Sequence, residues 1–381
     1  MATDTSMNHN GITVETSEPL SPMGGISEQL GAMIGTAPNK AAEVAYHEPI
    51  KLYGTKDLAK LDTTPDPQGT LYHNARFFLE EAKVPLYVIV VPEGATPTDT
   101  MQNIVGDIVP ATGQRTGLMA FAGCPEAPTN IGVPGFSDSS IVNQLATICD
   151  ELLAEGWTDG PDTNTAAAKT YAAEFGEAHK KVWCVDVHGE RWEHVIAPST
   201  YGMAARCTVK PWNTPNGAPL KLDDLARVVT YRSNDSQSEG VDLNKKGVSL
   251  AVGDPDGGIM FLGTRTLDGS FGNIIGVENQ IIREVVKSHR KTMKFNLDLD
   301  FFEMRIAQLS NWFATLRVDG AVINGKVYLH PERNTVERYN NGEWVLVIDW
   351  GAYRPNENSI VELNQVNGIV QTFVESAIQG A

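Results

Sequence analysis

The stretch GFSDS, residues 135–139, comes nearest to a catalytic motif in this chain of 381 residues. It lies between a predicted strand and a predicted helix and nearly matches G-x-S-x-G, the sharp turn that exposes a nucleophilic serine. Asp186 and His188 follow, so the order Ser, Asp, His is that of an α/β-hydrolase triad. One hypothesis is therefore a serine hydrolase that uses Ser137.

Two features weaken the hydrolase hypothesis. Ser139 replaces the second glycine and adds bulk where the sharp turn must pass. Asp186 and His188 lie two residues apart on one strand end, where they are poorly placed to take separate positions in a triad. A simpler interpretation is that Ser137 or Asp138 caps the following helix by accepting a backbone N–H. The sequence thus favours a protein that is not an enzyme.

The stretch DVHGERWEH, residues 186–194, contains residue types that bind metals. They are Asp186, His188, Glu190 and His194. The spacing of a helical H-x-x-x-H or H-E-x-x-H site is absent, and Gly189 indicates a turn out of the sheet. A solvated loop is the simpler interpretation, and we expect no metal site.

Other ligand motifs are weak or missing. DPDGG, residues 254–258, lacks the later glutamate of a calcium loop, and Gly257 suits a hairpin turn. There is no G-x-x-x-x-G-K-[ST] and no G-x-G-x-x-G, so we expect no cofactor. The cysteines show no C-x-x-C pair, which leaves free thiols and disulfides both open. They are Cys124, Cys149, Cys184 and Cys207.

One basic cluster contrasts with the acidic chain, whose formal net charge is -17. Helical spacing places five basic residues on one face: Arg283, Lys287, Arg290, Lys291 and Lys294. The other face carries Ile282, Val285, Val286, His289 and Met293. Stacked like charges repel, so the basic face is either a solvated surface or a docking face for an acidic partner. The overall acidity argues against broad nucleic-acid binding.

The composition, 41% hydrophobic and 20% charged, is that of a globular protein long enough for two or three domains. No apolar run approaches the roughly 20 residues that span a bilayer. The first ten residues lack a basic region followed by an apolar stretch, so we expect no signal peptide and no membrane insertion.

Helical and strand-like segments alternate through the first two thirds of the chain. The segments 84–91 and 181–187 are apolar on both faces, as in central strands that helices cover on each side. This alternation predicts an α/β body. We predict helices at 71–83, at 139–156 with Gly156 as the stop, and at 165–176, and an irregular loop at 101–115.

After about residue 270 the pattern changes. We predict helices at 278–295 and 300–320, followed by short strands within 321–332 and 343–353. The expected fold is therefore mixed, with an α/β central domain followed by a C-terminal α+β domain.

Both ends of the chain contain strand-like segments without a local partner. NGITVET, residues 10–16, alternates apolar and polar residues, and Pro19 and Pro22 interrupt any tight hairpin with the next segment. Near the C-terminus, helix and strand both fit residues 369–374. Unpaired strands are aggregation liabilities unless neighbouring molecules complete them. The predicted strand-exchange residues are Ile12, Thr13, Val14, Glu15, Ile369, Val370, Thr372 and Phe373.

Seven passages, in this order, resemble the tail sheath proteins of contractile-tailed bacteriophages and R-type bacteriocins. They are GITVETSEPLSPMGGI, PIKLYGTKDLAKL, HNARFFLEEAKVPLYVIVV, VPGFSDSSIVNQLATICDELL, KVWCVDV, GIMFLGTRTL and GAVINGKVYLHPERNT. The resemblance spans nearly the whole chain. Gly263 and Arg265 match a glycine and an arginine that precede the family's C-terminal domain.

The resemblance implies a structural subunit that stacks as hexameric rings, in a helical assembly, around a tail tube. It implies an N-terminal strand-exchange arm (1–22), an α/β body (23–270) with room for a small outer subdomain, a tube-facing domain (271–358) and a C-terminal strand-exchange arm (359–381). The implied partners are further copies of the chain, the tail tube protein, and the baseplate and tail terminator proteins.

The resemblance also implies a mechanism and a location. Contraction of the sheath would drive the tube through the host envelope, and the basic residues of 283–294 are our candidate contact with the tube. The protein would belong to the virion tail and assemble in the host bacterial cytoplasm. A phage-derived bacteriocin or a secretion-type injection machine uses the same kind of sheath, so these origins stay open.

Overall fold

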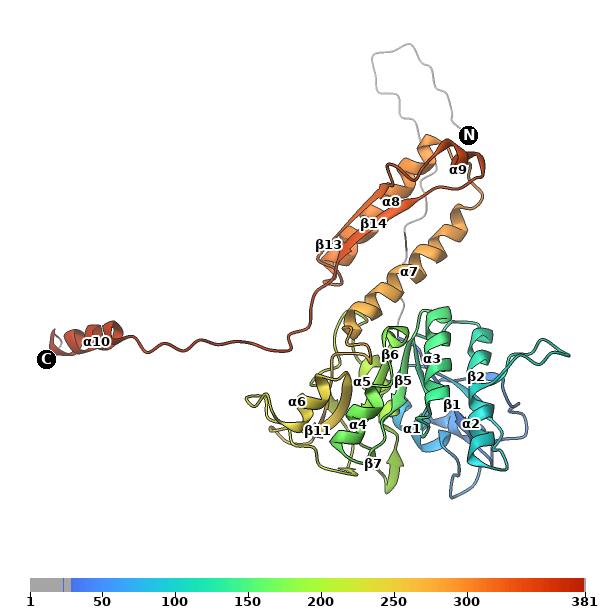
Figure 1. The fold of residues 1–381 in the computed structure, drawn as a ribbon, viewed down its shortest axis with the longest axis horizontal. Coiled ribbons are helices and arrows are strands. Elements are labelled where there is room, and N and C mark those ends of the chain that lie inside the picture. The colour runs from blue at the N-terminus through green and yellow to red at the C-terminus, as the bar shows by residue number, and fades with distance from the viewer. Residues whose placement is uncertain (1–22, 24–28, 380–381) are drawn as a thin grey trace, which may run out of the picture.

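The computed structural model describes residue 23 and residues 29–379 (Figure 1). Within these residues the chain has a mixed α/β fold. Its largest sheet has nine strands in the order β2-β3-β1-β4-β5-β6-β11-β12-β9. The strands are β1 (Gly31–Thr36), β2 (Pro49–Leu52), β3 (Leu86–Val91), β4 (Asn130–Gly132), β5 (Glu155–Asp159), β6 (Val182–Asp186), β9 (Pro219–Leu220), β11 (Val248–Gly253) and β12 (Ile259–Leu262).

The centre of this sheet is parallel, from β3 through β1, β4, β5 and β6 to β11. Antiparallel strands lie outside it, with β2 on one side and β12 and β9 on the other. Every residue of β1, β3, β5 and β6 is buried. The doubly apolar strands predicted from the sequence are thus the central ones, as expected for a sheet covered on both faces.

Helices cover both faces of the sheet. On one face, α1 (Leu71–Ala82) and α5 (Pro198–Cys207) pack on alternate strand residues such as Met33 and Val88. On the other face, Ile34 and Ile89 belong to the core of the remaining body helices. These are α2 (Pro97–Val105), α3 (Ser139–Leu152), α4 (Thr165–Ala172) and α6 (Glu239–Asn244).

Shorter elements complete the body. Three two- and three-residue strands form a second sheet: β7 (Gly189–Arg191), β8 (His194–Ile196) and β10 (Asp224–Leu225). Three 3-10 helices connect longer elements: Thr55–Lys60, Gly117–Gly123 and Glu177–His179. DPDGG is the turn between β11 and β12, with φ of 105° at Gly257, which confirms the hairpin interpretation.

Capping residues and backbone conformation explain which helix ends were predicted correctly and which were not. Asp138 caps α3 by accepting the N–H of Ser140, as predicted. The predicted stop at Gly156 is wrong, because Leu153 adopts the left-handed conformation that ends α3 and Gly156 lies within β5. The loop predicted at 101–115 is wrong in its first part, where a capping box at Thr96 starts α2.

A second, smaller core follows the sheet. It joins α7 (Gly272–Thr292), α8 (Leu299–Val318) and the hairpin of β13 (Asn324–Leu329) and β14 (Leu346–Gly351). The short α9 (Val336–Asn340) lies between the two strands. Helix α7 begins at Gly272 rather than at 278. The boundary near residue 270 and the four-region division stay predictions.

The C-terminal part of the chain leaves both cores (Figure 1). Every residue from Asn356 to Gln379 is exposed, and the last element is helix α10 (Asn367–Gln379). Of the two alternatives left open by the sequence, Ile369, Val370, Thr372 and Phe373 therefore adopt the helix in the single chain, and their role in strand exchange stays a prediction. A helix pairs its own backbone groups, whereas a strand without a neighbour leaves them unpaired. Ile12, Thr13, Val14 and Glu15 lie outside the described residues.

No helix among the described residues is long and apolar enough to cross a bilayer. The four cysteines are free thiols, and burial raises the pKa of each.

A half-buried histidine, His73, predicts that the fold loses stability in mild acid. His73 stacks on His194 with ring centroids 3.7 Å apart, and its ring nitrogens have no hydrogen-bond partner. Burial, followed by the charges of His194 and Arg76, lowers the pKa of His73 below 6.5. The folded state then binds this proton less tightly than the unfolded state, so the stabilisation is lost as pH falls below about 6.5.

We expect His73→Gln to remove part of this pH dependence. Between pH 7.5 and 5.5, the free energy of unfolding should fall less for His73→Gln than for the wild type in urea titrations. His289→Gln, which changes an exposed ring, is the control and should follow the wild type. Parallel curves for the wild type and His73→Gln would contradict the role of His73.

Candidate functional site: the base of helix α7

Helix α7 starts on the body with an unusually close approach. A Cβ atom at Gly272 would lie 1.8 Å from Cζ2 of Trp183, and one at Gly276 would lie 2.1 Å from Nη2 of Arg206. Only glycine fits at these two positions, which are one helical turn apart. The first turns of α7 therefore rest directly on the amino ends of β5 and β6.

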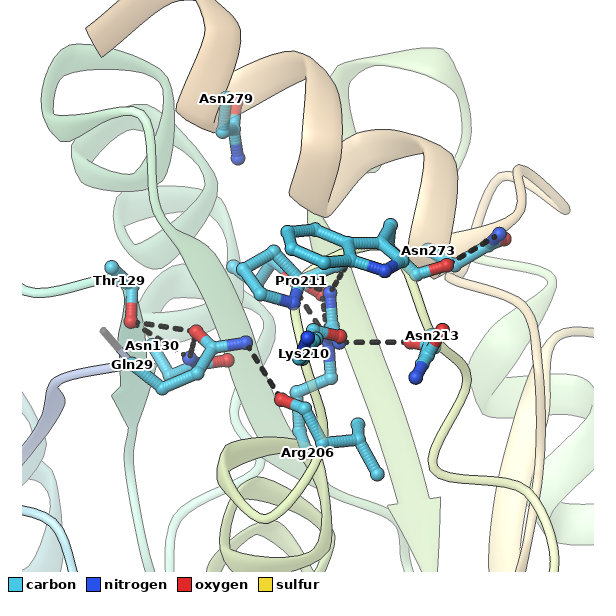
Figure 2. A network of polar contacts seen from close by, with 12 residues as sticks. Gln29, Thr129, Asn130, Arg206, Lys210, Pro211, Asn213, Asn273 and Asn279 are labelled. Carbon is cyan, nitrogen blue, oxygen red and sulfur yellow. Dashed lines mark hydrogen bonds and ion pairs between the residues drawn. The ribbon is translucent and has the colours of Figure 1, made fainter. Parts of the chain in front are cut away.

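An ion pair that is almost fully buried lies beneath Gly276. Arg206 is 0% exposed and donates to both carboxylate oxygens of Glu155 over 2.8–3.1 Å. The indole N–H of Trp183 donates to the same carboxylate over 2.8 Å. Figure 2 shows how Arg206 also reaches the turn after α5, where it donates to the carbonyl oxygens of Lys210, Pro211 and Asn213.

This network fixes the turn on which α7 rests. A buried ion pair adds little net stability by itself, because desolvation offsets the attraction. Removing one partner is costly, at about 3–5 kcal/mol, because the other charge stays buried and unpaired. The main role of Arg206 is therefore to hold residues 210–213 in one conformation through its hydrogen bonds.

Further hydrogen bonds and an ion pair hold α7 to the body. The amide of Asn273 donates to the carbonyl oxygens of Trp212 and Tyr353 over 3.3 and 3.0 Å. Glu278 pairs with Lys180 over 3.2 Å. The amide of Asn279 lies 3.5 Å from the carbonyl oxygen of Ala154.

Arg283 makes the last contact with the body. Its guanidinium donates to the carbonyl oxygens of Leu152 and Leu153, at the C-terminal end of α3, over 2.7 and 3.2 Å. It also donates to those of Ala127 and Pro128. Burial lowers the pKa of Arg283 to about 10. The carbonyl groups of the body thus occupy its donors, and its contact with the tube stays a prediction.

Beyond Arg283, α7 has three faces rather than the two predicted. One face packs on α8, and it includes the buried polar residues Glu284, Ser288 and Thr292, since Arg305 of α8 donates to Ser288 over 2.8 Å. The second is the basic stripe, which we define as Lys287, Arg290, Lys291 and Lys294, all exposed. The third is the apolar stripe, which we define as Ile282, Val286 and Met293, also exposed. At about 100° per residue, the faces lie roughly 120° apart.

Both ends of the described chain pass the base of α7. Gln29 precedes β1 and accepts from Thr129 and Asn130 over 3.0 Å (Figure 2). At the other end, Arg265 donates to both oxygens of Glu357 over 2.9 and 2.7 Å. Burial alone would raise the pKa of Glu357, but the hydrogen bonds from Arg265 and Thr264 lower it below its ordinary value. The bidentate pair anchors the root of the C-terminal segment.

The residues of the hydrolase hypothesis do not form a triad. His188 Nδ1 pairs with Asp162 over 2.6 Å, and the carboxylate of Asp186 accepts from Arg227 and from the N–H of Asp162. In the described part of the chain, no hydrogen bond joins Ser137 to His188. These side chains lie near the carboxyl ends of the parallel strands, opposite the base of α7.

The suggested metal ligands are also dispersed. His194 stacks on His73, while His188 is paired with Asp162. Across residues 29–379, no group of three His, Cys, Asp or Glu side chains is arranged to hold a metal ion.

Comparison with known proteins gives whole-chain similarities. The chain is 23% identical over 341 residues to a putative prophage major tail sheath protein of Pseudomonas aeruginosa (strain UCBPP-PA14), covering 84% of this chain and 86% of that protein. It is 21% identical over 379 residues to the tail sheath protein of Escherichia phage P2, covering 92% and 93%. The chain is thus similar, over most of its length, to tail sheath proteins. No family model matches it.

The fold of the chain agrees with this similarity. The contracted sheath complex of the extracellular contractile injection system PVC superposes with a TM-score of 0.73 at 15% identity, over 96% of this chain and 99% of that one. The relatives are structural sheath proteins rather than enzymes, which favours a structural role at the level of the family.

Sequence reasoning missed most of this site. It singled out Arg265 through the resemblance, but not its partner Glu357, nor Arg206, Glu155, Gly272 or Gly276. The one available signal is GNIIG, residues 272–276, where two glycines four positions apart indicate a helix face that approaches another element closely. Arg206 and Glu155 are 51 residues apart and carry no pairing signal.

Because α7 lies so close to the body, adding one methyl group at its base should lower the stability of the fold. We expect Gly276→Ala to lower the free energy of unfolding by about 1–3 kcal/mol, because the Cβ meets Arg206 and the carbonyl oxygen of Pro211 at 2.5 Å. Gly368→Ala is the control, since its surroundings in α10 are open. Guanidinium titration should leave the control within about 0.5 kcal/mol of the wild type. Equal midpoints for both variants would contradict the packing argument.

Proposed function

We propose that this sheath subunit polymerises by donating its terminal arms to the β13–β14 hairpins of neighbouring copies. The proposal is supported by two features together: open strand edges in the hairpin and an exposed apolar segment that follows it. Within the described residues, β13 and β14 pair only with each other, so each has an open edge. The segment after β14 exposes large apolar side chains that no other described residue covers.

The C-terminal arm has the properties of a donated strand. Ile360, Val361 and Leu363 are 81–94% exposed, and residues 352–366 have no regular secondary structure. Alternation places Val361 and Leu363 on one face of an extended strand. That face would continue the apolar side of the hairpin, where Val327 and Ile348 pack toward α8. Main-chain hydrogen bonds to an open edge supply the affinity.

The residues at 10–16 would act as the second donated strand. Their alternation of apolar and polar residues supports this role. Met23, which follows them in the sequence, packs against the second core. Ile369, Val370, Thr372 and Phe373 are better explained as a helix that follows the donated strand at 359–363.

A head-to-tail contact that does not close on itself produces a helical assembly. We propose that stacked hexameric rings form in this way around a tail tube, with baseplate and terminator proteins at the two ends. Contraction would rotate each subunit as a rigid body while the donated strands keep neighbours connected. The bonds that hold α7 to the body support rigid rotation. Assembly in the host bacterial cytoplasm is part of the same proposal.

The basic stripe is the proposed contact with the tube. Its four cations are exposed, and Lys287 also pairs with the buried Glu284 over 3.2 Å. An exposed cluster of one sign binds an acidic surface through contacts that salt weakens. Such contacts can hold an extended sheath and still release it.

Breaking the donated strand should stop polymerisation. Prolines at Val361 and Glu362 remove two successive N–H groups, so donors on both sides of the strand are lost. We expect folded monomers with an unchanged unfolding midpoint and no striated tubes in negative-stain electron microscopy. Prolines at Asn364 and Gln365, between the strand and α10, form the matched control and should leave tubes intact. Normal tubes from the first variant would rule out this strand.

Reversing the basic stripe should separate self-assembly from tube binding. With Lys287, Arg290, Lys291 and Lys294 replaced by Glu, we expect sheath that still self-assembles but does not form in the extended state on tubes. The measurement is electron microscopy of sheath mixed with purified tubes at low and high salt. Reversal of Lys56, Lys83, Lys245 and Lys246 on the body is the charge-matched control. Normal extended sheath on tubes from the first variant would contradict the tube contact.

A further inference from the structure

Helix α10 is amphipathic, and no part of the chain that the structure describes packs on it. Its apolar residues follow helical spacing, and each of them is exposed: Ile369, Val370, Phe373, Val374, Ala377 and Ile378. Polar residues such as Gln371 and Thr372 occupy the opposite face. A stable helix of this kind normally gains its stability by packing its apolar face on another surface.

The apolar stripe of α7 is exposed within residues 29–379. Ile282, Val286 and Met293 recur at four- and seven-residue steps, the spacing of a helix–helix seam. None of them belongs to the second core, although Val285 beside them does. Met293 is 73% exposed. The stripe continues beyond the last contact of α7 with the body, so it lies on the part of the helix that carries the hairpin.

We propose that α10 of one copy packs its apolar face on the apolar stripe of α7 in a second copy. The inference rests on the proposed function, because the donated strand brings the helix to its neighbour. Only three residues separate Leu363 from Asn367, the first residue of α10. A strand added to a neighbour's hairpin therefore delivers α10 to the same neighbour, whose α7 and hairpin share one core.

Charge favours the same pairing. Residues 359–381 contain Glu362 and Glu375 and no Lys, Arg or His. The basic stripe borders the apolar stripe on α7, so an acidic segment is attracted to this face before apolar contact forms. Helix-in-groove binding of this kind joins apolar anchors with flanking charge.

The geometry of the single chain argues for a second copy as the partner. The segment from Glu357 to Asn367 spans at most about 33 Å, at roughly 3.3 Å per residue. That length suffices to reach the chain's own α7, yet the arm runs away from α7 and α10 contacts nothing there (Figure 1). The pair between Arg265 and Glu357 holds the root of the arm at the base of α7.

Cysteine cross-linking between two full-length variants tests the proposal. Val286→Cys and Val370→Cys, each in a Cys124→Ser background, are mixed, assembled and treated with a short bismaleimide. The remaining native thiols are buried. We expect a dimer joined at 286 and 370 by mass spectrometry, at least tenfold more abundant than with either control partner. The controls replace Val370→Cys by Thr372→Cys, or Val286→Cys by Lys291→Cys, on the opposite helix faces.

Each outcome decides the proposal. Striated tubes without the 286–370 link, or equal yields from the controls, would overturn the docking and leave the proposed function standing. A link found only within one chain, when the double variant is diluted in wild type, would overturn the second copy as partner. A link from 286 to residues 1–28 would assign the stripe to the other arm and also overturn the proposal. Absence of tubes would count against the proposed function, while cross-links in smaller oligomers would still support the docking.

Discussion

The close approach of α7 to a buried ion pair is the constraint on which the arrangement of this protein depends. Arg206 holds the turn at 210–213 only because Glu155 compensates its charge, and α7 rests on that turn only because residues 272 and 276 are glycines. A helix of 21 residues then carries this fixed starting direction into the second core. Since sharp kinks in helices need a proline or a packing defect, the direction set at the base of α7 determines where the hairpin lies relative to the body.

The same base also sets where the arms leave the chain. Glu357 is tied to Arg265, and Asn273 binds the carbonyl oxygen of Tyr353, so the C-terminal arm starts from a rigid point. From Asn356 to Gln379 no residue is buried. An arm that is fixed at Glu357 and exposes apolar side chains further along suits a connection between subunits. The fixed start limits the volume that the rest of the arm explores. A higher effective concentration at the neighbouring hairpin follows from that restriction.

Local signals let the sequence predict much of the body, and distant contacts account for most of what it could not. Uniformly apolar runs identified β3 and β6, and a capping aspartate explained the start of α3. The faces of α7 were misassigned because helical periodicity describes one helix alone. Arg305 of α8 recruits polar residues to the buried side, and Arg283 is drawn to the carbonyl groups at the end of α3. Helix and strand both fitted residues 369–374, and the single chain forms the helix, since no partner strand is present to favour the alternative.

The three faces of α7 place contacts of different physical character on one rigid element. The buried face is insensitive to solvent, the basic stripe weakens with salt, and the apolar stripe strengthens with salts that are excluded from protein surfaces. If the tube takes the basic stripe and α10 of a neighbour takes the apolar stripe, ionic conditions shift the two attachments in opposite directions. A subunit can then leave the tube while it stays joined to its neighbours. This is the separation that contraction requires, because the sheath must slide on the tube without falling apart.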